Sequence, residues 1–204
     1  MPIEYTHGLI NCSRESLVDQ LRQTIKPSRF EHVLRVESTA LSLAEKLDAD
    51  LETVSVVALM HDFAKEMPAD SMLELALKFW PNEELKLAND NIWHGPAAAQ
   101  LCKDQFGCND QSMLNAIAGH TIGWFEMDQL AKILYMADYI EPGRNFKGVE
   151  KARQLTNENL DKACEFKMTE TIKYLIKQRV IIFPGTIDIY NAWIEQKMFS
   201  EERI

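Results

Sequence analysis

The sequence lacks any long apolar run. Its 204 residues contain no stretch of about 18 or more apolar side chains, so no segment is expected to cross a membrane as a helix. The opening residues, MPIEYTHGLINC, also lack the basic segment and the following apolar segment of a secretory signal. From both absences we expect a protein that stays in the cytoplasm.

Cysteine is also scarce. The chain has four cysteines, and none of them belongs to a Cys-x-x-Cys pair. Their spacing therefore fits no zinc ribbon or zinc finger. We expect free thiols in a reducing compartment rather than disulfides at these positions: Cys12, Cys102, Cys108 and Cys164.

Positive charge is in deficit. The chain carries 22 lysines and arginines against 31 aspartates and glutamates, which gives a formal net charge of −9. Proteins that grip a nucleic-acid backbone usually show a basic face, and no run rich in lysine or arginine occurs, so we expect no nucleic-acid partner. An anionic ligand would need positive charge that is supplied locally, by a metal ion or by a few placed lysines and arginines.

Several common motifs of nucleotide-binding proteins and hydrolases are missing as well. The sequence has no G-x-x-x-x-G-K-[ST] phosphate loop, no G-x-G-x-x-G fingerprint, no G-x-S-x-G nucleophile turn and no H-E-x-x-H zinc motif. The families that those motifs define are therefore excluded. The placement of histidine and aspartate remains as the main source of chemistry.

Helix patterns fill the chain, whereas strand patterns are rare. A first helix is expected after Ser13. Ser28 and Glu31 have the spacing of a capping box at the start of the second helix. Asp50 is expected to cap a third helix, which is apolar on nearly all sides over residues 54–60 and should therefore be buried.

Further helices follow at short intervals. Pro68 should begin one that ends near Trp80. The stretch His94-Gly95-Pro96 has the form of a helix start with proline at the first helical position. The remaining boundaries are expected at Gly107, around residues 110–120 and 128–141, at the break Pro142-Gly143, and at Phe183-Pro184-Gly185 between two longer helices.

The pattern predicts a single all-α domain. No internal repeat, low-complexity tract or linker divides the chain. We expect one helical domain over residues 13–204, preceded by an extension over residues 1–12. The sequence allows a homodimer without deciding for or against one.

Ionisable residues stand at unusual places in this pattern. Asp138 lies four residues after Leu134, on or beside an apolar stripe, where a carboxylate is costly unless it is paired or bound to a metal. Each such feature alone is weak evidence, because core histidines and chance His-Asp pairs are common. Together they favour a metal or catalytic site, since four histidines also fall at helix ends or beside apolar stripes: His32, His61 (followed by Asp62), His94 and His120.

The ordered pattern of these residues resembles the HD superfamily of metal-dependent phosphohydrolases, whose fold is all-α. The surrounding segments are similar to the bacterial YqeK family of symmetrical diadenosine tetraphosphate hydrolases: RFEHVLRV, VALMHDFAKEMP, IWHGPAAA, AIAGHTIG and YMADYIEPGRNFKGV. The resemblance covers about residues 14–196 and includes the tail FPGTIDIYNAWIE. Ile122 stands where the family often has threonine, and Lys147 where it often has proline. Both positions border the expected substrate cleft.

The resemblance implies a metal site and a phosphate site. The implied metal ligands are His32, His61, Asp62 and Asp138, with His61 and Asp62 as catalytic residues. Mixed imidazole and carboxylate ligands suit iron, with manganese or zinc as alternatives. The implied substrate-binding residues are Arg29, Lys65, His94, His120, Thr121 and Arg144. Neighbours on a regular helix point about 100° apart, so His61 and Asp62 can share one ion only if the helix unwinds there.

The expected reaction is metal-assisted hydrolysis of diadenosine tetraphosphate to two ADP. A helix start at Pro96 would give His94 free amide groups for phosphate, while a second ion shared through Asp62 is the alternative. Two other functions stay open. One is an HD-domain phosphohydrolase for mononucleotides or signalling nucleotides, and the other is a non-catalytic module that binds nucleotides. Such modules commonly lose metal ligands, and this chain keeps them all.

Overall fold

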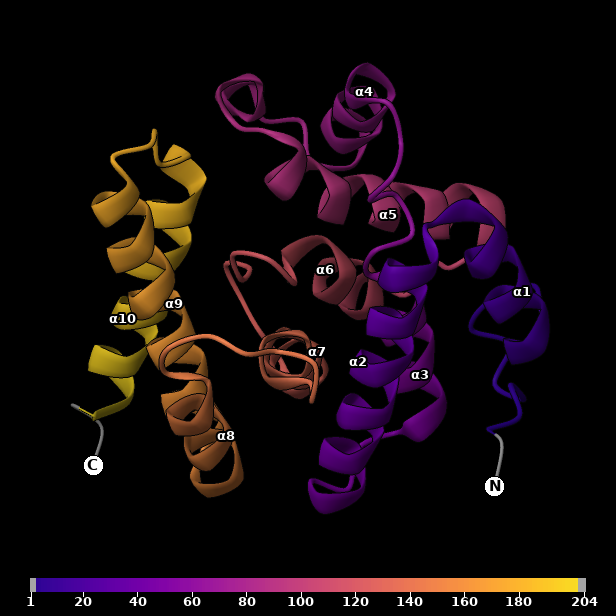
Figure 1. The fold of residues 1–204 in the computed structure, drawn as a ribbon, viewed down its shortest axis with the longest axis horizontal. Coiled ribbons are helices and arrows are strands. Elements are labelled where there is room, and N and C mark those ends of the chain that lie inside the picture. The colour runs from indigo at the N-terminus through magenta and orange to yellow at the C-terminus, as the bar shows by residue number, and fades with distance from the viewer. Residues whose placement is uncertain (1–2, 202–204) are drawn as a thin grey trace.

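The protein is all-α, as the sequence predicts. A computed structural model describes residues 3–201, with side chains described as far as residue 198. Within residues 3–201 it contains α-helices and one short 3-10 helix and no strand (Figure 1). None of the described helices is long and apolar enough to cross a membrane.

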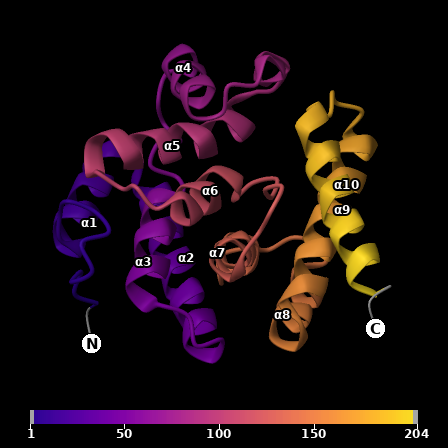
Figure 2. The ribbon, with the colours of Figure 1, turned by 180° about the vertical axis from the view of Figure 1, so that it is seen from behind.

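The helices follow one another with short connections. Their bounds are α1 Arg14–Thr24, α2 Pro27–Lys46, α3 Leu51–Met60, α4 Ala69–Phe79, η1 Glu83–Leu87, α5 Asp90–Phe106, α6 Gln111–Gly119, α7 Gln129–Ile140, α8 Val149–Glu158, α9 Leu160–Gln178 and α10 Pro184–Glu201. α7 lies at the centre and packs against α2, α6 and α9 (Figure 1). α5 crosses α6, and α4 covers the outer side of α5 (Figure 2). The centre of the molecule is thus reached from several helices at once.

α3 is the buried helix that the apolar run predicts. Asp50 caps it by accepting the backbone N–H of Thr53 at 2.7 Å, and every residue from Val54 to Met60 is buried. The α-helix ends at Met60, and a series of turns begins at His61. The chain therefore unwinds at the point where a shared ion would require His61 and the next residue to converge.

The predicted start of the second helix is wrong. α2 begins at Pro27, and its N-cap is Lys26, which makes no side-chain hydrogen bond. Ser28 and Glu31 lie inside the first turns, so they form no capping box. Proline suits the first helical position because its fixed φ matches the helix, and because an N–H at that position would have no acceptor within the helix.

The predicted start of the helix that carries His94 is also wrong. α5 begins at Asp90, and Asn89 caps it by accepting the N–H of Asn91 at 3.0 Å. Pro96 therefore lies inside α5 and removes one helical hydrogen bond. His94 stands in the second turn of the helix and has no free amide groups to offer a phosphate. The predicted end of this helix is confirmed, because Gly107 terminates it in the left-handed conformation with φ of 72°.

The last third of the chain contains three helices where two are expected. Asn159 separates α8 from α9 and caps α9 by accepting the N–H of Lys162 at 2.9 Å. A single asparagine in a helical pattern was too weak a signal for this break. The break before α10 falls where the sequence predicts it, since α10 begins at Pro184.

Residues 3–12 form no helix and pack on the helical body. Glu52 in α3 accepts the backbone N–H groups of Thr6 and His7 at 2.7 and 2.9 Å. The N–H of Asn11 donates to the carbonyl of Phe106 at the end of α5, at 2.8 Å. The segment is therefore held at both ends of its path.

Gly95 allows α5 and α6 to approach each other closely. A Cβ atom at this position would lie 2.5 Å from the carbonyl oxygen of Ala118 in α6, which is far inside van der Waals contact. The contact is to backbone, so no side chain can turn aside. Because His94 and His120 flank these positions in sequence, the close approach of the helices sets the distance between the two rings.

We expect Gly95→Ala to destabilise the fold by about 1–3 kcal/mol, because its methyl group would push the two helices apart, although alanine is the better helix former. Lys103→Ala, at an exposed position of the same helix, should change the free energy of unfolding by less than about 0.5 kcal/mol. Urea unfolding followed by circular dichroism measures both variants. A Gly95→Ala protein as stable as the wild type would contradict the close approach.

Candidate metal and phosphate site

Six ionisable side chains meet at the centre of the molecule. They come from five helices and from the turn that follows α3, and five of the six are buried. All six were singled out in the sequence: His32 in α2, His61 at the end of α3, Asp62 in the turn, His94 in α5, His120 at the end of α6 and Asp138 in α7.

The histidine rings are oriented by their own helices. In three of them Nδ1 lies within hydrogen-bond distance of a backbone carbonyl, which accepts but cannot donate. At His61 and His120, Nδ1 therefore carries the proton and Nε2 presents a lone pair to the site, whereas Nδ1 of His94 also faces a donor, Lys65 Nζ, at 3.3 Å. The three pairs are His61 with the carbonyl of Ala58 (2.6 Å), His94 with that of Asp90 (2.9 Å) and His120 with that of Ile117 (2.8 Å).

The fourth ring, His32, is held by a buried carboxylate. Its Nδ1 lies 3.1 Å from Oε1 of Glu141, whose Oε2 accepts from Arg35 Nε at 2.6 Å and from the N–H of Gly143 at 2.5 Å. Burial opposes the charge of Glu141, but Arg35 and the Gly143 amide outweigh it and lower the pKa of this carboxyl. The ionised carboxylate fixes the proton of His32 on Nδ1, so that Nε2 is again free.

Glu141 was not singled out from the sequence. Its signal was present, because a glutamate that directly follows the apolar helix of Asp138 and precedes a Pro-Gly break has few structural reasons to be there. Carboxylates behind a metal-binding histidine orient the ring and make it a better ligand. Glu141 stands in that relation to His32.

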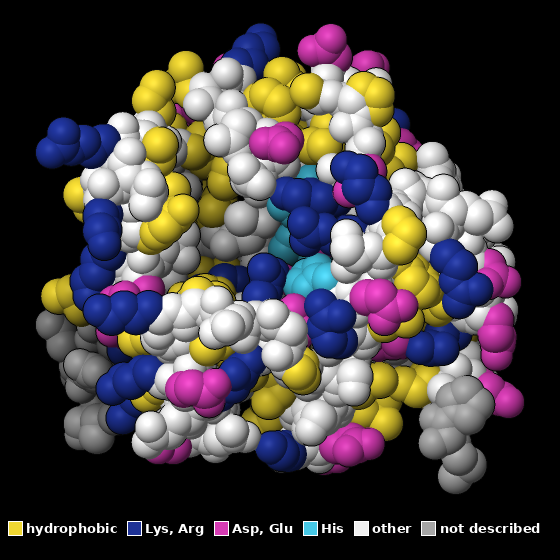
Figure 3. Space-filling view, viewed as in Figure 1, with side chains coloured by type: hydrophobic (Ala, Val, Ile, Leu, Met, Phe, Trp, Pro, Cys, Tyr) yellow, Lys and Arg dark blue, Asp and Glu magenta, His cyan; other side chains and the backbone are white. Residues whose placement is uncertain are grey.

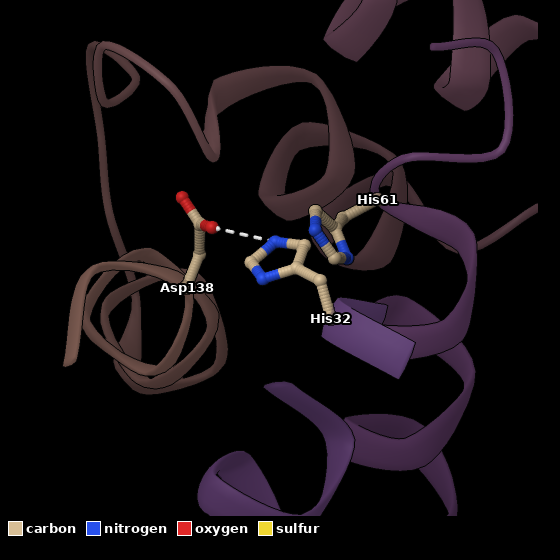
Figure 4. Close-up of side chains that lie close together, drawn as sticks. All are labelled: His32, His61 and Asp138. Carbon is tan, nitrogen blue, oxygen red and sulfur yellow. Dashed lines mark ion pairs between the residues drawn. The ribbon is translucent and has the colours of Figure 1, made fainter. Parts of the chain in front are cut away.

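His32, His61 and Asp138 offer three ligand atoms within 4.8 Å of one another (Figure 4). The Nε2 atoms of His32 and His61 are buried and have no hydrogen-bond partner, and Asp138 Oδ1 lies 3.2 Å from Nε2 of His32. A buried polar atom without a partner is costly, and a bound cation would remove that cost. Imidazole nitrogens and carboxylate oxygens suit a divalent ion, so the residues fit one.

Asp62 joins this group to a second one. Its Oδ2 lies 3.4 Å from Nε2 of His61 and accepts from Arg29 Nη1 at 3.0 Å, while its Oδ1 lies 3.2 Å from Nε2 of His94. Burial would raise the pKa of Asp62, but His61 and His94 outweigh burial and lower it well below its ordinary value. The carboxylate is thus ionised, and its two oxygens face different histidines. His61, Asp62 and His120 also place ligand atoms within 4.8 Å of one another.

His94 and His120 face each other through their Nε2 atoms at 2.9 Å. Because Lys65 can donate to Nδ1 of His94, the proton of that ring can sit on Nε2 and donate to Nε2 of His120. Burial, His94 and His61 lower the pKa of His120 well below its ordinary value, so His120 does not carry an additional proton. Nε2 of His94 also lies 3.2 Å from Oδ1 of Asp62, which can accept the same proton.

A cavity of about 220 Å³ opens onto these rings. Figure 3 shows blue basic side chains and cyan histidines gathered around a hollow in this face of the molecule. All six predicted substrate-binding residues lie in its wall, which is formed by Arg29, Asp62, Lys65, Asn91, His94, His120, Thr121, Asp138 and Arg144. A second cavity, of about 260 Å³, shares Arg29 and Arg144 with the first and continues past Ser28, Arg35 and Gly143.

Hydrogen bonds to neighbouring side chains and to backbone hold the cations of the cavity wall in place. Arg144 donates from Nη2 to Asp138 Oδ1 at 2.5 Å and from Nε to the carbonyl of Asp138 at 2.8 Å. Lys65 donates to Oδ1 of Asn91 at 3.0 Å. Burial lowers the pKa of Lys65, and Asp62 opposes that effect. Thr121 lies with its hydroxyl 3.2 Å from Nε2 of His120.

Lys167 is a second residue that sequence reasoning missed. It lies in α9 and is only 3% exposed, with Nζ 3.8 Å from Oδ2 of Asp138. Burial lowers the pKa of Lys167 to about 8, and Asp138 opposes that effect. Burial would in turn raise the pKa of Asp138, but the hydrogen bond with His32 and the charges of Lys167 and Arg144 outweigh burial and lower this pKa well below its ordinary value. The sequence contained a signal for Lys167, because this lysine lies on the same helix face as Ala163 and other apolar residues.

Comparisons with known proteins place this chain in a family. The model of the HD domain matches residues 29–143. A symmetrical bis(5'-nucleosyl)-tetraphosphatase of Bacillus subtilis is 34% identical over 182 residues, which are 89% of this chain and 97% of that protein. The protein of the same name from Staphylococcus aureus is 32% identical and covers 90% of this chain and 93% of its own length.

A solved structure agrees with these matches. The crystal structure of a predicted HD superfamily hydrolase involved in NAD metabolism from Clostridium acetobutylicum has a TM-score of 0.84 and 35% sequence identity. The match covers 91% of this chain and 98% of that one. The chain is therefore an HD-domain hydrolase, and it belongs to the family of the symmetrical bis(5'-nucleosyl)-tetraphosphatases.

Proposed function

We propose that this protein hydrolyses diadenosine tetraphosphate symmetrically to two ADP with the help of a divalent metal ion. The observation that carries the proposal is the site itself, where four histidine Nε2 atoms and two carboxylates meet beside a cavity that three cations line. The relatives that share about a third of its residues over nearly its whole length bear the name of this activity.

The metal ligands that we propose are His32, His61, Asp62 and Asp138. HD domains bind divalent metals, and we propose iron as the ion, with manganese or zinc as alternatives. When bound, the ion supplies Lewis-acid chemistry that lowers the pKa of a coordinated water. His61 and Asp62 are the catalytic residues that we propose, because His61 belongs to both groups of clustered ligand atoms and Asp62 lines the cavity. A second ion at Asp62 and the facing pair His94 and His120 is the alternative to direct phosphate contact by those rings.

The phosphate chain of the substrate would lie in the cavity. Arg29, Lys65 and Arg144 supply positive charge there in a protein whose net charge is −9, because focused local charge can hold an anion on an acidic protein. Arginine offers a planar fork of donors that matches phosphate oxygens. The hydroxyl of Thr121 and the rings of His94 and His120 are proposed as further phosphate contacts.

The reaction consumes one water. Its oxygen forms a bond to one of the two central phosphorus atoms, and the bond from that phosphorus to the central bridging oxygen breaks. The departing ADP needs a proton on that oxygen, for which His94, His120 and Lys65 are the candidates in the cavity wall. The cations stabilise the charge that develops on the phosphoryl oxygens.

The first test is the identity of the products. We expect the protein loaded with iron(II) or manganese to convert diadenosine tetraphosphate to ADP alone, measured by ion-exchange chromatography. AMP together with ATP, or no product, would overturn the proposal, and a panel of mononucleotides and cyclic dinucleotides would then identify another substrate. Asp62→Asn should abolish the activity, because it removes the charge that both histidine groups share.

The second test concerns the metal. We expect Asp138→Asn to weaken Mn²⁺ binding by more than about 100-fold. Mutating a residue that only hydrogen-bonds to a metal ligand costs up to about 100-fold in affinity, and loss of a ligand itself should cost more. Asp128→Asn at the start of the same helix is the matched control, since Asp128 caps α7 and accepts from Ser112 outside the cavity wall, and asparagine caps equally well. Isothermal titration calorimetry measures both.

The same titration should depend on pH. Protons compete with the ion for the histidine lone pairs, and Asp62 raises the pKa of His61 against the effect of burial. Affinity for Mn²⁺ should therefore fall steadily as pH falls from about 8 to about 6. Equal affinity for Mn²⁺ in Asp138→Asn and the wild type, or an affinity that pH leaves unchanged, would show that the ion binds elsewhere.

The third test concerns the phosphate site. Lys65→Ala should raise KM for diadenosine tetraphosphate by about 10-fold or more, because a hydrogen bond to a charged group contributes about 1.5–3 kcal/mol. Lys103→Ala removes the same charge from an exposed position outside the cavity wall and should leave KM unchanged. Steady-state kinetics compare the two variants, and equal KM values would remove Lys65 from the site.

A further inference from the structure

Lys167 is a buried lysine of α9 that contacts both α6 and α7. It enters the core from α9, and its side chain is about as buried as those of Asp62 and His94. Its Nζ lies 3.5 Å from the centre of the Tyr135 ring, so aromatic surface covers one side of the ammonium group. Lysine is almost never fully buried unless it is paired, so its partners indicate what it does.

Two of those partners are backbone carbonyls. Nζ donates to the carbonyl of His120 at 3.0 Å and to that of Tyr135 at 2.7 Å. His120 is the C-cap of α6, and the last carbonyls of a helix lack partners within the helix. An ammonium group at that position donates a hydrogen bond to a carbonyl that lacks a partner in the helix, and its positive charge suits the negative end of the helix dipole. Lys167 therefore fixes the turn that carries His120 and Thr121.

The third partner is the carboxylate of Asp138. Its Oδ1 accepts from Arg144 and lies 3.2 Å from Nε2 of His32, whereas its Oδ2 faces Lys167 Nζ at 3.8 Å. That distance is too long for a hydrogen bond but short enough for charge to be balanced. The ammonium thus neutralises Asp138 in the core and leaves Oδ2 free to bind something else.

We propose that Lys167 is a positioning residue that holds Asp138 and the His120–Thr121 turn in the arrangement needed for metal and phosphate. The residue does not line the cavity, so it acts through these groups rather than on the substrate. The kinetic part of this inference rests on the proposed function, while the part that concerns the metal stands without it.

Lys167→Met is the first variant, because methionine fills nearly the same volume without charge or donors. We expect its dissociation constant for Mn²⁺ to rise by about 10–100-fold, as for other groups that orient metal ligands. Calorimetry on the protein without substrate measures it. Binding that is unchanged or tighter would overturn the proposal, since tighter binding would mean that the ammonium merely competes with the ion.

Met168→Ala is the matched control for lost packing. Met168 is the next residue of α9, is 3% exposed, and places its Cε 2.8 Å from a Cβ atom added at Gly123. It should lower Tm while the affinity for Mn²⁺ stays at the wild-type value. If both variants lose affinity in proportion to their loss of Tm, Lys167 has only a structural role.

The kinetic readout separates positioning from substrate binding. At saturating Mn²⁺, Lys167→Met should lower kcat for diadenosine tetraphosphate because Asp138 is misplaced, and it should raise KM less than Lys65→Ala does because the three cations of the cavity wall are kept. A rise in KM alone would assign Lys167 to substrate binding. If the wild type does not hydrolyse this substrate, the proposed function fails, but the calorimetric result still decides the role of Lys167.

Lys167→Ala offers a test by chemical rescue. The variant lacks the three outer carbons and the ammonium group, which n-propylammonium would replace in the vacated space. We expect n-propylammonium, but not n-propanol, to restore part of the affinity for Mn²⁺. Equal effects of the two compounds would show that volume matters and charge does not, which would contradict the proposal.

Discussion

The hydrogen bonds at Nδ1 of the four histidines control the rest of this site. Three of the acceptors are carbonyls three or four residues earlier in the same helix, at Ala58, Asp90 and Ile117, so ordinary helix geometry sets the direction of each ring. With the protons of His61 and His120 fixed on Nδ1, the Nε2 atoms of these two rings face the centre as lone pairs. Two carboxylates in the same space add negative charge. Such an arrangement is stable only with positive charge beside it, and the surrounding cations supply part of it.

The electrostatics of the cavity follow from that requirement. Arg29 and Arg144 each pair with a carboxylate of the centre and also line both cavities. They therefore serve two purposes: they stabilise the two aspartates of the centre, and they present donors to an anion that enters the cavity. An acidic protein can in this way bind a highly charged polyphosphate, because the relevant field is local while the remaining acidic groups are spread over the surface.

Much of this arrangement was predictable from the sequence. Polar residues that interrupt apolar patterns, such as the His61-Asp62 doublet after α3 and Asp138 within α7, are the residues that the structure brings together at its centre. The same rule applied to α9 would have found Lys167. Two helix starts were wrong because proline admits several positions near a helix end: Pro27 begins α2, whereas Pro96 lies inside α5. Distances between residues far apart in sequence depend on how the helices pack, so no local sequence pattern predicts them. The distance between the rings of His94 and His120, for example, depends on the close packing at Gly95.

The ligand atoms lie within a few ångströms of one another but belong to residues as far apart in sequence as His32 and Asp138. An ion bound there would act as a crosslink between α2, α3 and α7 that exists only in the folded chain. Such binding adds about 2.7 kcal/mol to the free energy of unfolding when the free ion is at 100 times its dissociation constant. The supply of the ion would therefore regulate how much enzyme survives proteolysis as well as how fast each molecule works.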